Sequence, residues 1–261
     1  MSKKEVVHKE EITYFLRCML DIAGHETKQG KDFEKRYAKR LNFQSETEWK
    51  KYRACVDLLE DTEYAIISAF EYQLGDLSNK HKDSNGMYLR LYGILNAVYL
   101  QMSAYQELAD LLKYSLDKKQ LRKLFHQLDI YKLRTIAGSH TLNFTTKGEI
   151  LEDEKETSFR IFASNIEETG FNITVLSQHG KLIKFNLLVI LHEYEKIARN
   201  LLIQMVKHAI NNLVKKKKEK ADLTKQLEKK LKNLIDYSKI DKNKVHSEKK
   251  QKNKEYYIIK C

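Results

Sequence analysis

The chain has 261 residues, 42% of them hydrophobic, which is enough for one large domain or two small ones with a substantial core. It contains no proline, the commonest helix breaker, so we expect long helices. The longest apolar run, residues 187–191, is too short to span a bilayer, and the first residues lack the apolar stretch of a signal peptide. The odd count and the spacing of Cys18, Cys55 and Cys261 predict reduced thiols in a cytoplasmic protein, without a disulfide framework or a metal site.

The net charge of +12 is unevenly distributed along the chain. Residues 215–261 contain 17 Lys and 7 Asp or Glu, so they hold +10 of that charge and residues 1–214 are nearly neutral. We therefore expect a helical domain over 1–214 and a lysine-rich tail over 215–261 that is helical or disordered. Such a tail favours RNA or DNA through counterion release, but it is also typical of a solvated terminus that only aids solubility.

The first part of the chain shows the apolar spacing of amphipathic helices. Over residues 9–24, apolar side chains stand at positions 12, 15, 16, 19, 20 and 23. A polar segment over 31–41 predicts a short helix. Ser45 and Glu48 have the spacing of a capping box, which predicts the start of a long helix that continues to about residue 76.

Three further helices are expected before residue 141, and their predicted ranges are 87–114, 118–127 and 130–137. The first is long and rich in Leu and Tyr. Asp117 is the expected N-cap of the second helix and Asp129 that of the third, which Gly138 ends. Residues 141–157 are polar and then acidic, which indicates an exposed loop.

Alternating residues then predict a strand over 158–163 and a β-hairpin formed by 171–176 and 182–187. Asn186 is the expected cap of a strong helix over 187–214, and leucines at four-residue or three-residue intervals predict a short helix over 223–234. Residues 256–259 have the pattern of a strand. Together these elements predict a mainly α fold: a long-helix bundle with a small β-hairpin insertion at about 158–187 and a basic C-terminal helix or tail.

Arg134 and His140 lie in the sequence LRTIAGSH at the end of the third of these helices. An imidazole moves protons at neutral pH, and a guanidinium binds a phosphate and stabilises its developing charge. This pair can therefore cleave RNA without a metal. The spacing alone is weak evidence, because about one such pair is expected by chance in a chain of this composition. The structural alternative is a surface Arg134 paired with a carboxylate and a His140 that is simply a loop residue.

In a continuous helix, two residues six positions apart point in directions about 120° from each other. Gly138 changes this geometry, because a left-handed residue there lets the chain leave the helix and brings His140 back towards Arg134. The hydroxyl groups of Ser139 and Thr141 can then bind a phosphate or orient the imidazole.

Long helices followed by an Arg-x(4–6)-His element resemble the HEPN superfamily, all-helical proteins of toxin–antitoxin, abortive-infection and CRISPR defence systems. The resemblance covers roughly residues 46–140, and its specific element is Arg134 with His140. Many members have Asn or another polar residue after the Arg, and this chain has Thr135 there, which is polar but not Asn. Leu142 stands where some members have a modified Tyr, and the hairpin expected at 171–187 interrupts the family's usual helical ending.

The resemblance implies a metal-independent, cofactor-free endoribonuclease whose two protomers bring their Arg–His pairs together at a dimer interface. His140 would transfer protons to or from the ribose 2′-hydroxyl and the leaving 5′-oxygen, while Arg134 would stabilise the charge on phosphorus. The products would be a 2′,3′-cyclic phosphate and a 5′-hydroxyl. An antitoxin or another regulatory partner is also expected. We expect further RNA contacts from Lys132, Thr135, Ser139, Thr141, Lys215, Lys216, Lys217 and Lys218.

Other patterns in the sequence are less specific. Arg122 and His126 stand at i and i+4 on one helix, either as an auxiliary phosphate contact or as a surface pair. His192 and Glu195 have a spacing that metal sites use, but no matching second pair occurs. A stripe of Tyr residues in the helix over 87–114 indicates core or interface, with base stacking as the alternative.

Three functions therefore compete. The first is a ribonuclease of HEPN type that acts as a toxin or antiviral effector. The second is a non-catalytic helical protein that binds nucleic acid through its tail, and the third is a helical scaffold of a larger complex. Mutation of Arg134 or His140 separates the first from the other two, and deletion of residues 215–261 separates the second from the third.

Overall fold

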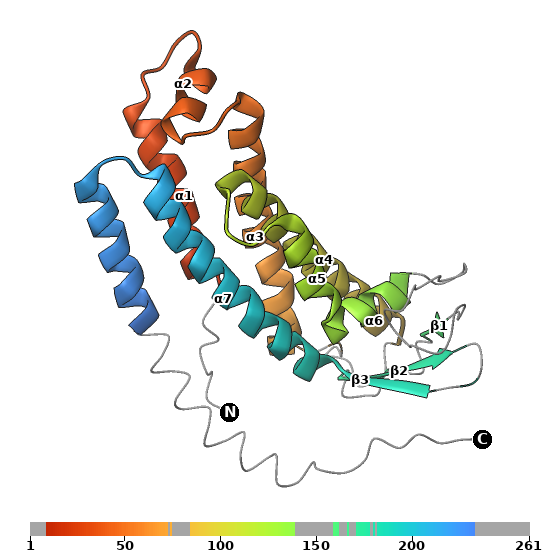
Figure 1. Cartoon of the computed structure of the whole chain (residues 1–261). Coiled ribbons are helices and arrows are strands. Elements are labelled where there is room, and N and C mark those ends of the chain that lie inside the picture. Colours follow the sequence, from red (N-terminus) through yellow and green to blue (C-terminus); the bar gives the residue numbers. More distant parts are fainter. Residues whose placement is uncertain are drawn as a thin grey trace.

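The structure is a computed structural model and describes residues 9–72, 74, 84–138, 159–161, 166, 171–177, 180 and 182–232. This part of the chain is mainly helical, with a small antiparallel sheet at one end (Figure 1). The helices are α1 (Glu10–Glu26), α2 (Phe33–Arg40), α3 (Glu46–Tyr72), α4 (Ser84–Leu112), α5 (Lys118–His126), α6 (Asp129–Gly138) and α7 (Leu187–Leu213). A further helix covers 217–232. The expected fold class is thereby confirmed.

The four long helices α1, α3, α4 and α7 form the bundle, and the most extensive helix pairing joins α3 to α4. The buried hydrophobic residues of α1 recur every three or four positions, as the sequence predicts: Ile12, Phe15, Leu16, Met19, Leu20 and Ala23. Helix α7 buries a similar stripe against α1 and α4. Helices α5 and α6 pack on α4, and α6 also contacts α7 and β1.

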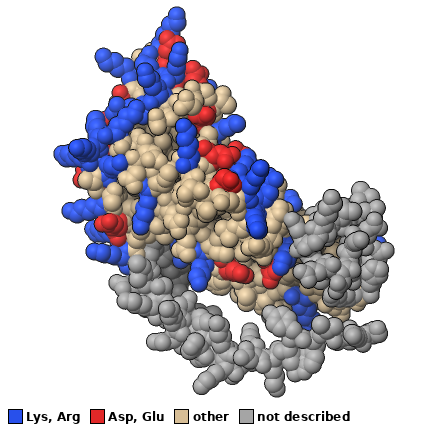
Figure 2. All heavy atoms as spheres, in the orientation of Figure 1, with Lys and Arg blue, Asp and Glu red and all other residues tan. Residues whose placement is uncertain are grey.

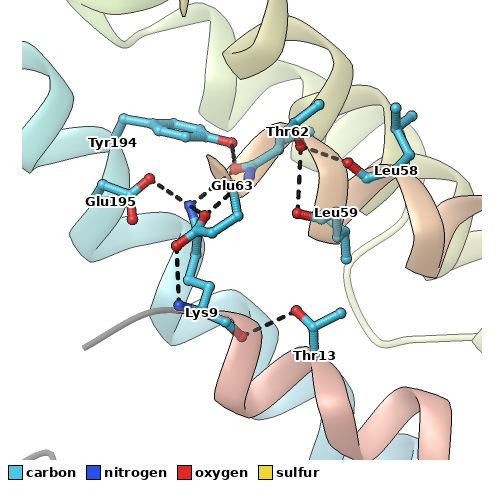
Figure 3. Close-up of polar contacts among 9 residues, drawn as sticks. Lys9, Thr13, Leu58, Leu59, Thr62, Glu63, Tyr194 and Glu195 are labelled. Carbon is cyan, nitrogen blue, oxygen red and sulfur yellow. Dashed lines mark hydrogen bonds and ion pairs between the residues drawn. The ribbon is translucent and has the colours of Figure 1, made fainter. Parts of the chain in front are cut away.

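A buried polar cluster joins all four long helices (Figure 3). The Lys9 ammonium lies 2.9 Å from a carboxylate oxygen of Glu63, donates a 2.9 Å hydrogen bond to Gln101 and forms an ion pair with Glu195. The Tyr194 hydroxyl donates to the same Gln101 oxygen at 2.9 Å. Both carboxylates and the ammonium are nearly inaccessible to solvent, so each charge depends on the others for its stabilisation.

The sheet comprises β1 (Phe159–Arg160), β2 (Asn172–Ser177) and β3 (Leu182–Asn186), in that order and antiparallel. Ile173 pairs with Phe185, and both side chains are buried. The chain passes from β3 directly into α7. The side chain of Asn186 caps α7 by accepting a hydrogen bond from the Val189 amide at 3.1 Å. The predicted hairpin and its helix cap are both confirmed.

Two of the other predicted caps are also present. The Glu48 amide donates to Ser45 Oγ at 3.3 Å, although the Glu48 carboxylate accepts from the amide of Gln44 rather than from that of Ser45. Asp117 and Gln120 form a complete capping box at the start of α5. Asp129 does not precede its helix but is the first residue of α6.

The chain reverses direction after α7, at an extended Val214. The helix over 217–232 then lies beside α1, where Lys230 binds the Glu11 carboxylate at 2.9 Å and Leu223 and Leu227 are buried (Figure 1). The first part of the lysine-rich segment is therefore a packed helix. The acidic loop expected over 141–157 and the strand expected over 256–259 lie outside the described residues.

Candidate functional site

Arg134 lies in the middle of α6 and is half-buried against α4. Its guanidinium carbon is 3.9 Å from the centroid of the Tyr99 ring, a close cation–π contact. Among the described residues, no carboxylate forms an ion pair with Arg134. The ring covers one face of the guanidinium, while the N–H donors lie in the guanidinium plane and remain available to a ligand.

The C-terminal end of α6 is fixed to α4 by a hydrogen bond. The Tyr92 hydroxyl donates to the carbonyl of Ala137 at 2.6 Å and lies 3.0 Å from the hydroxyl of Tyr88. Burial, followed by the hydrogen bond with Tyr88, raises the pKa of Tyr92 above its ordinary value, so the phenol stays protonated and able to donate. Helix α6 ends at Gly138, the residue that the sequence predicts as its end.

A hollow of about 430 Å³ lies on the surface formed by α4, α5 and α6, beside the Tyr99 ring that Arg134 contacts. We call it the α4–α6 hollow. Tyr99 connects the two features, because its ring contacts Arg134 and also lines the hollow. The other side chains that matter for its chemistry are Glu107, Lys118, Arg122, His126 and Tyr131. The volume lies within the range of small-ligand sites.

Both cationic and aromatic groups line the α4–α6 hollow. The rings of His126 and Tyr131 are stacked, with 4.1 Å between their centroids and 19° between their planes. Arg122 is exposed and has no ion pair with a described residue, whereas Lys118 pairs with Glu107 and lies 4.0 Å from Asp110. The hollow thus offers a cation for phosphate next to flat ring faces on which a base can stack.

Helix α6 also contains two of the residues predicted to contact RNA. The Lys132 ammonium donates to Asp129 at 2.8 Å, one turn away on the same helix. The Thr135 hydroxyl oxygen is buried and has no hydrogen-bond partner among the described residues. The remaining predicted residues of this group, Ser139, His140 and Thr141, lie outside the described residues.

The predicted lysines 215–218 are not brought together with Arg134. They follow α7, whereas α6 lies near the start of α7 beside the sheet (Figure 1). Helix α7 has 27 residues and is about 40 Å long, so the two regions lie towards its opposite ends. Lys215 instead donates to the carbonyl of Lys39 at 3.2 Å, and Lys216 pairs with Glu26 and, at 3.2 Å, with Glu219. Lys217 and Lys218 are exposed.

The i, i+3 pair on α7 diverges in the structure. His192 packs against the ring of Phe70, with 4.7 Å between centroids, while Glu195 turns inward to Lys9. Within the described ranges, no group of three or more His, Cys, Asp or Glu side chains is placed to hold a metal ion.

The sequence indicates Arg122 and His126 either as an auxiliary phosphate contact or as a surface pair, but it does not predict the α4–α6 hollow. Tyr131 comes from α6 and Tyr99 from α4, so the hollow exists only when three segments pack together. The stripe of Tyr residues on α4 only partly indicated this surface, because the sequence interpretation gave core or interface, with base stacking as the alternative. Its members differ: Tyr105 is fully buried in the core, and Tyr99 faces the hollow.

No family model, curated protein or solved structure matches the chain. Within the part of the chain that the structure describes, no helix has both the length and the apolar character needed to cross a membrane.

Proposed function

We propose that the protein is a metal-independent endoribonuclease that binds single-stranded RNA across the α4–α6 hollow, with Arg134 at the scissile phosphate. The observation that supports this most directly is the position of Arg134, held on the Tyr99 ring at the edge of a hollow with cationic and aromatic walls. An arginine that has no carboxylate partner among the described residues, and whose donors lie in one plane, is well suited to bidentate phosphate binding.

The described walls of the hollow suit the rest of the RNA strand. Unstacked bases bind aromatic faces, and the stacked pair of His126 and Tyr131 presents such a face. Arg122 lines the same hollow one helical turn from His126. It supplies a second cation that can bind a phosphate of the same RNA strand. Double-stranded RNA would not expose its bases to these rings, so a single strand is the preferred substrate class.

In the proposed reaction the ribose 2′-oxygen attacks phosphorus as the P–O5′ bond breaks. His140 accepts the 2′-hydroxyl proton, and a protonated imidazole returns a proton to the 5′-oxygen, with the partner copy's Arg–His pair completing the site. Arg134 stabilises the extra negative charge on the phosphoryl oxygens. His140 is two positions after Gly138, so their Cα atoms are at most about 7 Å apart. A toxin or antiviral effector role would follow from this activity.

A second candidate is a non-catalytic RNA-binding protein. One observation favours it: Arg122, His126, Tyr131 and Tyr99 already form a binding surface among the described residues, without any contribution from His140. In that case, substitutions at these four residues would weaken RNA binding, but the wild-type protein would not cleave RNA.

The test is cleavage of end-labelled mixed RNA by the purified full-length protein in EDTA. We expect Arg134→Ala and His140→Ala each to reduce cleavage at least about a hundredfold, the typical contribution of one general acid or base or one charge-stabilising donor. The matched controls are Arg53→Ala on α3 and His25→Ala on α1, which should cleave like the wild type. Equal activity of wild type and Arg134→Ala would reject the proposal. If the wild type does not cleave RNA but Arg134→Ala weakens RNA binding, the second candidate is favoured.

A composite active site also predicts the oligomeric state. Light scattering of the full chain should give the mass of a dimer, with the two Arg134 sites related by a two-fold axis. A monomer that cleaves RNA at full rate at the lowest measurable concentration would contradict the shared site while leaving the roles of Arg134 and His140 intact.

A further inference from the structure

A second hollow, of about 660 Å³, lies at the other end of the bundle from Arg134. We call it the basic hollow. The turn between α1 and α2 forms one wall, α2 forms another, and Lys215 reaches it from the end of α7. Figure 2 shows Lys and Arg side chains gathered over this end of the molecule. Its cationic residues are Lys28, Lys31, Arg36, Lys39, Arg40 and Lys215.

The basic hollow has one carboxylate among its lining residues, Glu26, and that charge is already neutralised. Arg40 and Lys216 both form ion pairs with it. Lys28, Lys31 and Lys39 are exposed, and their ammonium groups have no ion pair with any described residue. A concave surface with a large excess of one charge concentrates counter-ions of the opposite sign.

The wall of the basic hollow is held in shape without a ligand. The Arg36 guanidinium donates to the backbone carbonyls of Lys31 at 2.5 Å and Lys28 at 2.8 Å, which folds the turn around it. Gly30, with φ of 113°, allows the sharp reversal that this requires. The lysine side chains therefore extend from a fixed backbone, which lowers the entropy cost of binding an anion.

Among the described residues, no aromatic or large apolar side chain lines the basic hollow. It offers no ring for stacking and no apolar pocket for a base, so it can recognise phosphate but not sequence. It is also widely open to solvent, and the exposed Lys217 and Lys218 continue its positive surface along the chain. An open, extended surface suits a strand that passes across it better than a small ion enclosed within it.

We infer that the basic hollow binds the phosphate backbone of RNA, independently of base sequence, at the end of the bundle that is remote from Arg134. The inference rests on the proposed function only for the identity of the polyanion. It assigns the bundle two separate RNA contacts: the α4–α6 hollow takes bases and the phosphate to be cleaved, and the basic hollow holds the backbone of the same substrate.

The experiment measures binding of full-length protein to 2′-O-methyl RNA, which has no free 2′-hydroxyl and is not cleaved. Fluorescence anisotropy is recorded over a range of salt concentrations for wild type and two triple variants. One variant has Lys28→Gln, Lys31→Gln and Lys39→Gln. The control has Lys225→Gln, Lys229→Gln and Lys232→Gln on the exposed side of the helix over 217–232, with the same loss of charge.

We expect the first triple variant to bind roughly tenfold more weakly at near-physiological salt, the sum of three exposed charge contacts. The slope of log affinity against log salt should fall by about two, because each phosphate contact with a single strand contributes about 0.7. Oligo-U and oligo-A probes should lose affinity equally. The control variant should change affinity by less than about threefold.

Equal losses in the two triple variants, or wild-type binding by the first, would overturn the inference. Displacement of RNA by tripolyphosphate at much lower concentration than by a short RNA would also overturn it, since the hollow would then be a small-anion site. Arg134→Ala tests the proposed function separately. Suppose that Arg134→Ala binds and cleaves RNA like the wild type, while the variant at Lys28, Lys31 and Lys39 binds RNA weakly. The proposed active site is then rejected, and RNA binding by the basic hollow is retained.

Discussion

The Tyr92 hydroxyl and the Ala137 carbonyl are joined by a 2.6 Å hydrogen bond between α4 and the last turn of α6. The last carbonyls of a helix have no partner within that helix, so a phenol from a neighbouring helix satisfies one of them here. The bond fixes the end of α6 between two groups of interest, Arg134 one turn earlier and His140 three residues later. It therefore connects packing of the bundle to the proposed chemistry.

We predict that Tyr92→Phe lowers the free energy of unfolding by about 1 kcal/mol, the usual contribution of one such hydrogen bond. We also expect a lower kcat for RNA cleavage, because the end of α6 is less precisely held. Urea unfolding and single-turnover cleavage measure the two effects. Tyr114→Phe is the matched control: it removes a hydroxyl bonded to Gln204 at 2.6 Å, and kcat should not change. An unchanged kcat in Tyr92→Phe would show that the hydrogen bond from Tyr92 to Ala137 does not contribute to catalysis.

Tyr99 should matter through its ring rather than its hydroxyl. Tyr99→Phe keeps the cation–π contact with Arg134, so RNA affinity should stay within about twofold of wild type. Tyr99→Leu removes a contact of about 0.5–1 kcal/mol and should weaken RNA binding about twofold to fivefold. Titration with uncleavable RNA measures both. The proposed role of the ring is wrong if the Phe variant loses as much as the Leu variant.

Replacement of Lys9 should be among the most damaging changes in the bundle. Lys9→Met leaves the Glu63 and Glu195 carboxylates buried without their cation, and we expect a loss of about 3–5 kcal/mol in unfolding free energy. Adding Glu63→Gln and Glu195→Gln to the same chain should recover much of that loss, because no charge is then stranded. Urea denaturation of the single and triple variants measures both changes. A triple variant as unstable as Lys9→Met would show that the loss does not come from the unpaired carboxylates.

The same cluster predicts a pH effect. Burial raises the pKa of Glu195 above its ordinary value of 4.5, although the Lys9 ammonium opposes the shift. The folded state then binds this proton more readily than the unfolded state, so the stabilisation is full below the ordinary pKa and is lost as pH rises through the folded pKa. Subtracting the unfolding free energy of Glu195→Gln from that of wild type isolates this group. The difference should fall as pH rises from about 4, and a difference that rises with pH would show the opposite shift.

Cys55 should be chemically inert in the folded protein. Its side chain is buried, and desolvation raises the pKa of its thiol to about 11. Because only the thiolate reacts, iodoacetamide at about pH 8 should label Cys55 at a small fraction of its rate in urea. Peptide mass spectrometry follows the reaction site by site. Rapid native labelling would show that α3 opens easily at this position.

The helices and the hairpin could be predicted because their signals are local. The apolar positions of α1 recur with the period of one helix face, and every one of the predicted positions is buried. The Asp117 and Asn186 caps require only a side chain and an amide three residues away. Helix limits were less accurate: α3 ends at Tyr72 rather than near residue 76, and α4 begins at Ser84 rather than at residue 87.

Arg134 was identified from sequence, but its surroundings were not. Its cation–π partner comes from a helix 35 positions earlier, and the stack of His126 on Tyr131 forms across the junction of α5 and α6. Lysines 215–218 are predicted to contact the same RNA as Arg134, but the structure places them away from α6, with Lys215 beside Lys39 of α2 and Lys216 paired with Glu26 of α1. The spacing of residues in the sequence does not indicate which ends of long helices lie next to each other in the folded protein.

The sequence by itself determined the helical class, the order of the elements, the hairpin and the cationic character of the C-terminal part, because periodicity, caps and charge act over a few neighbouring residues. Only the tertiary structure decided that Lys9 is buried between two carboxylates, that Arg134 rests on Tyr99, and that one hollow forms between α4, α5 and α6 and another between α1, α2 and Lys215. Those relationships join residues far apart in the chain, and they exist only after the helices pack and desolvate the groups between them.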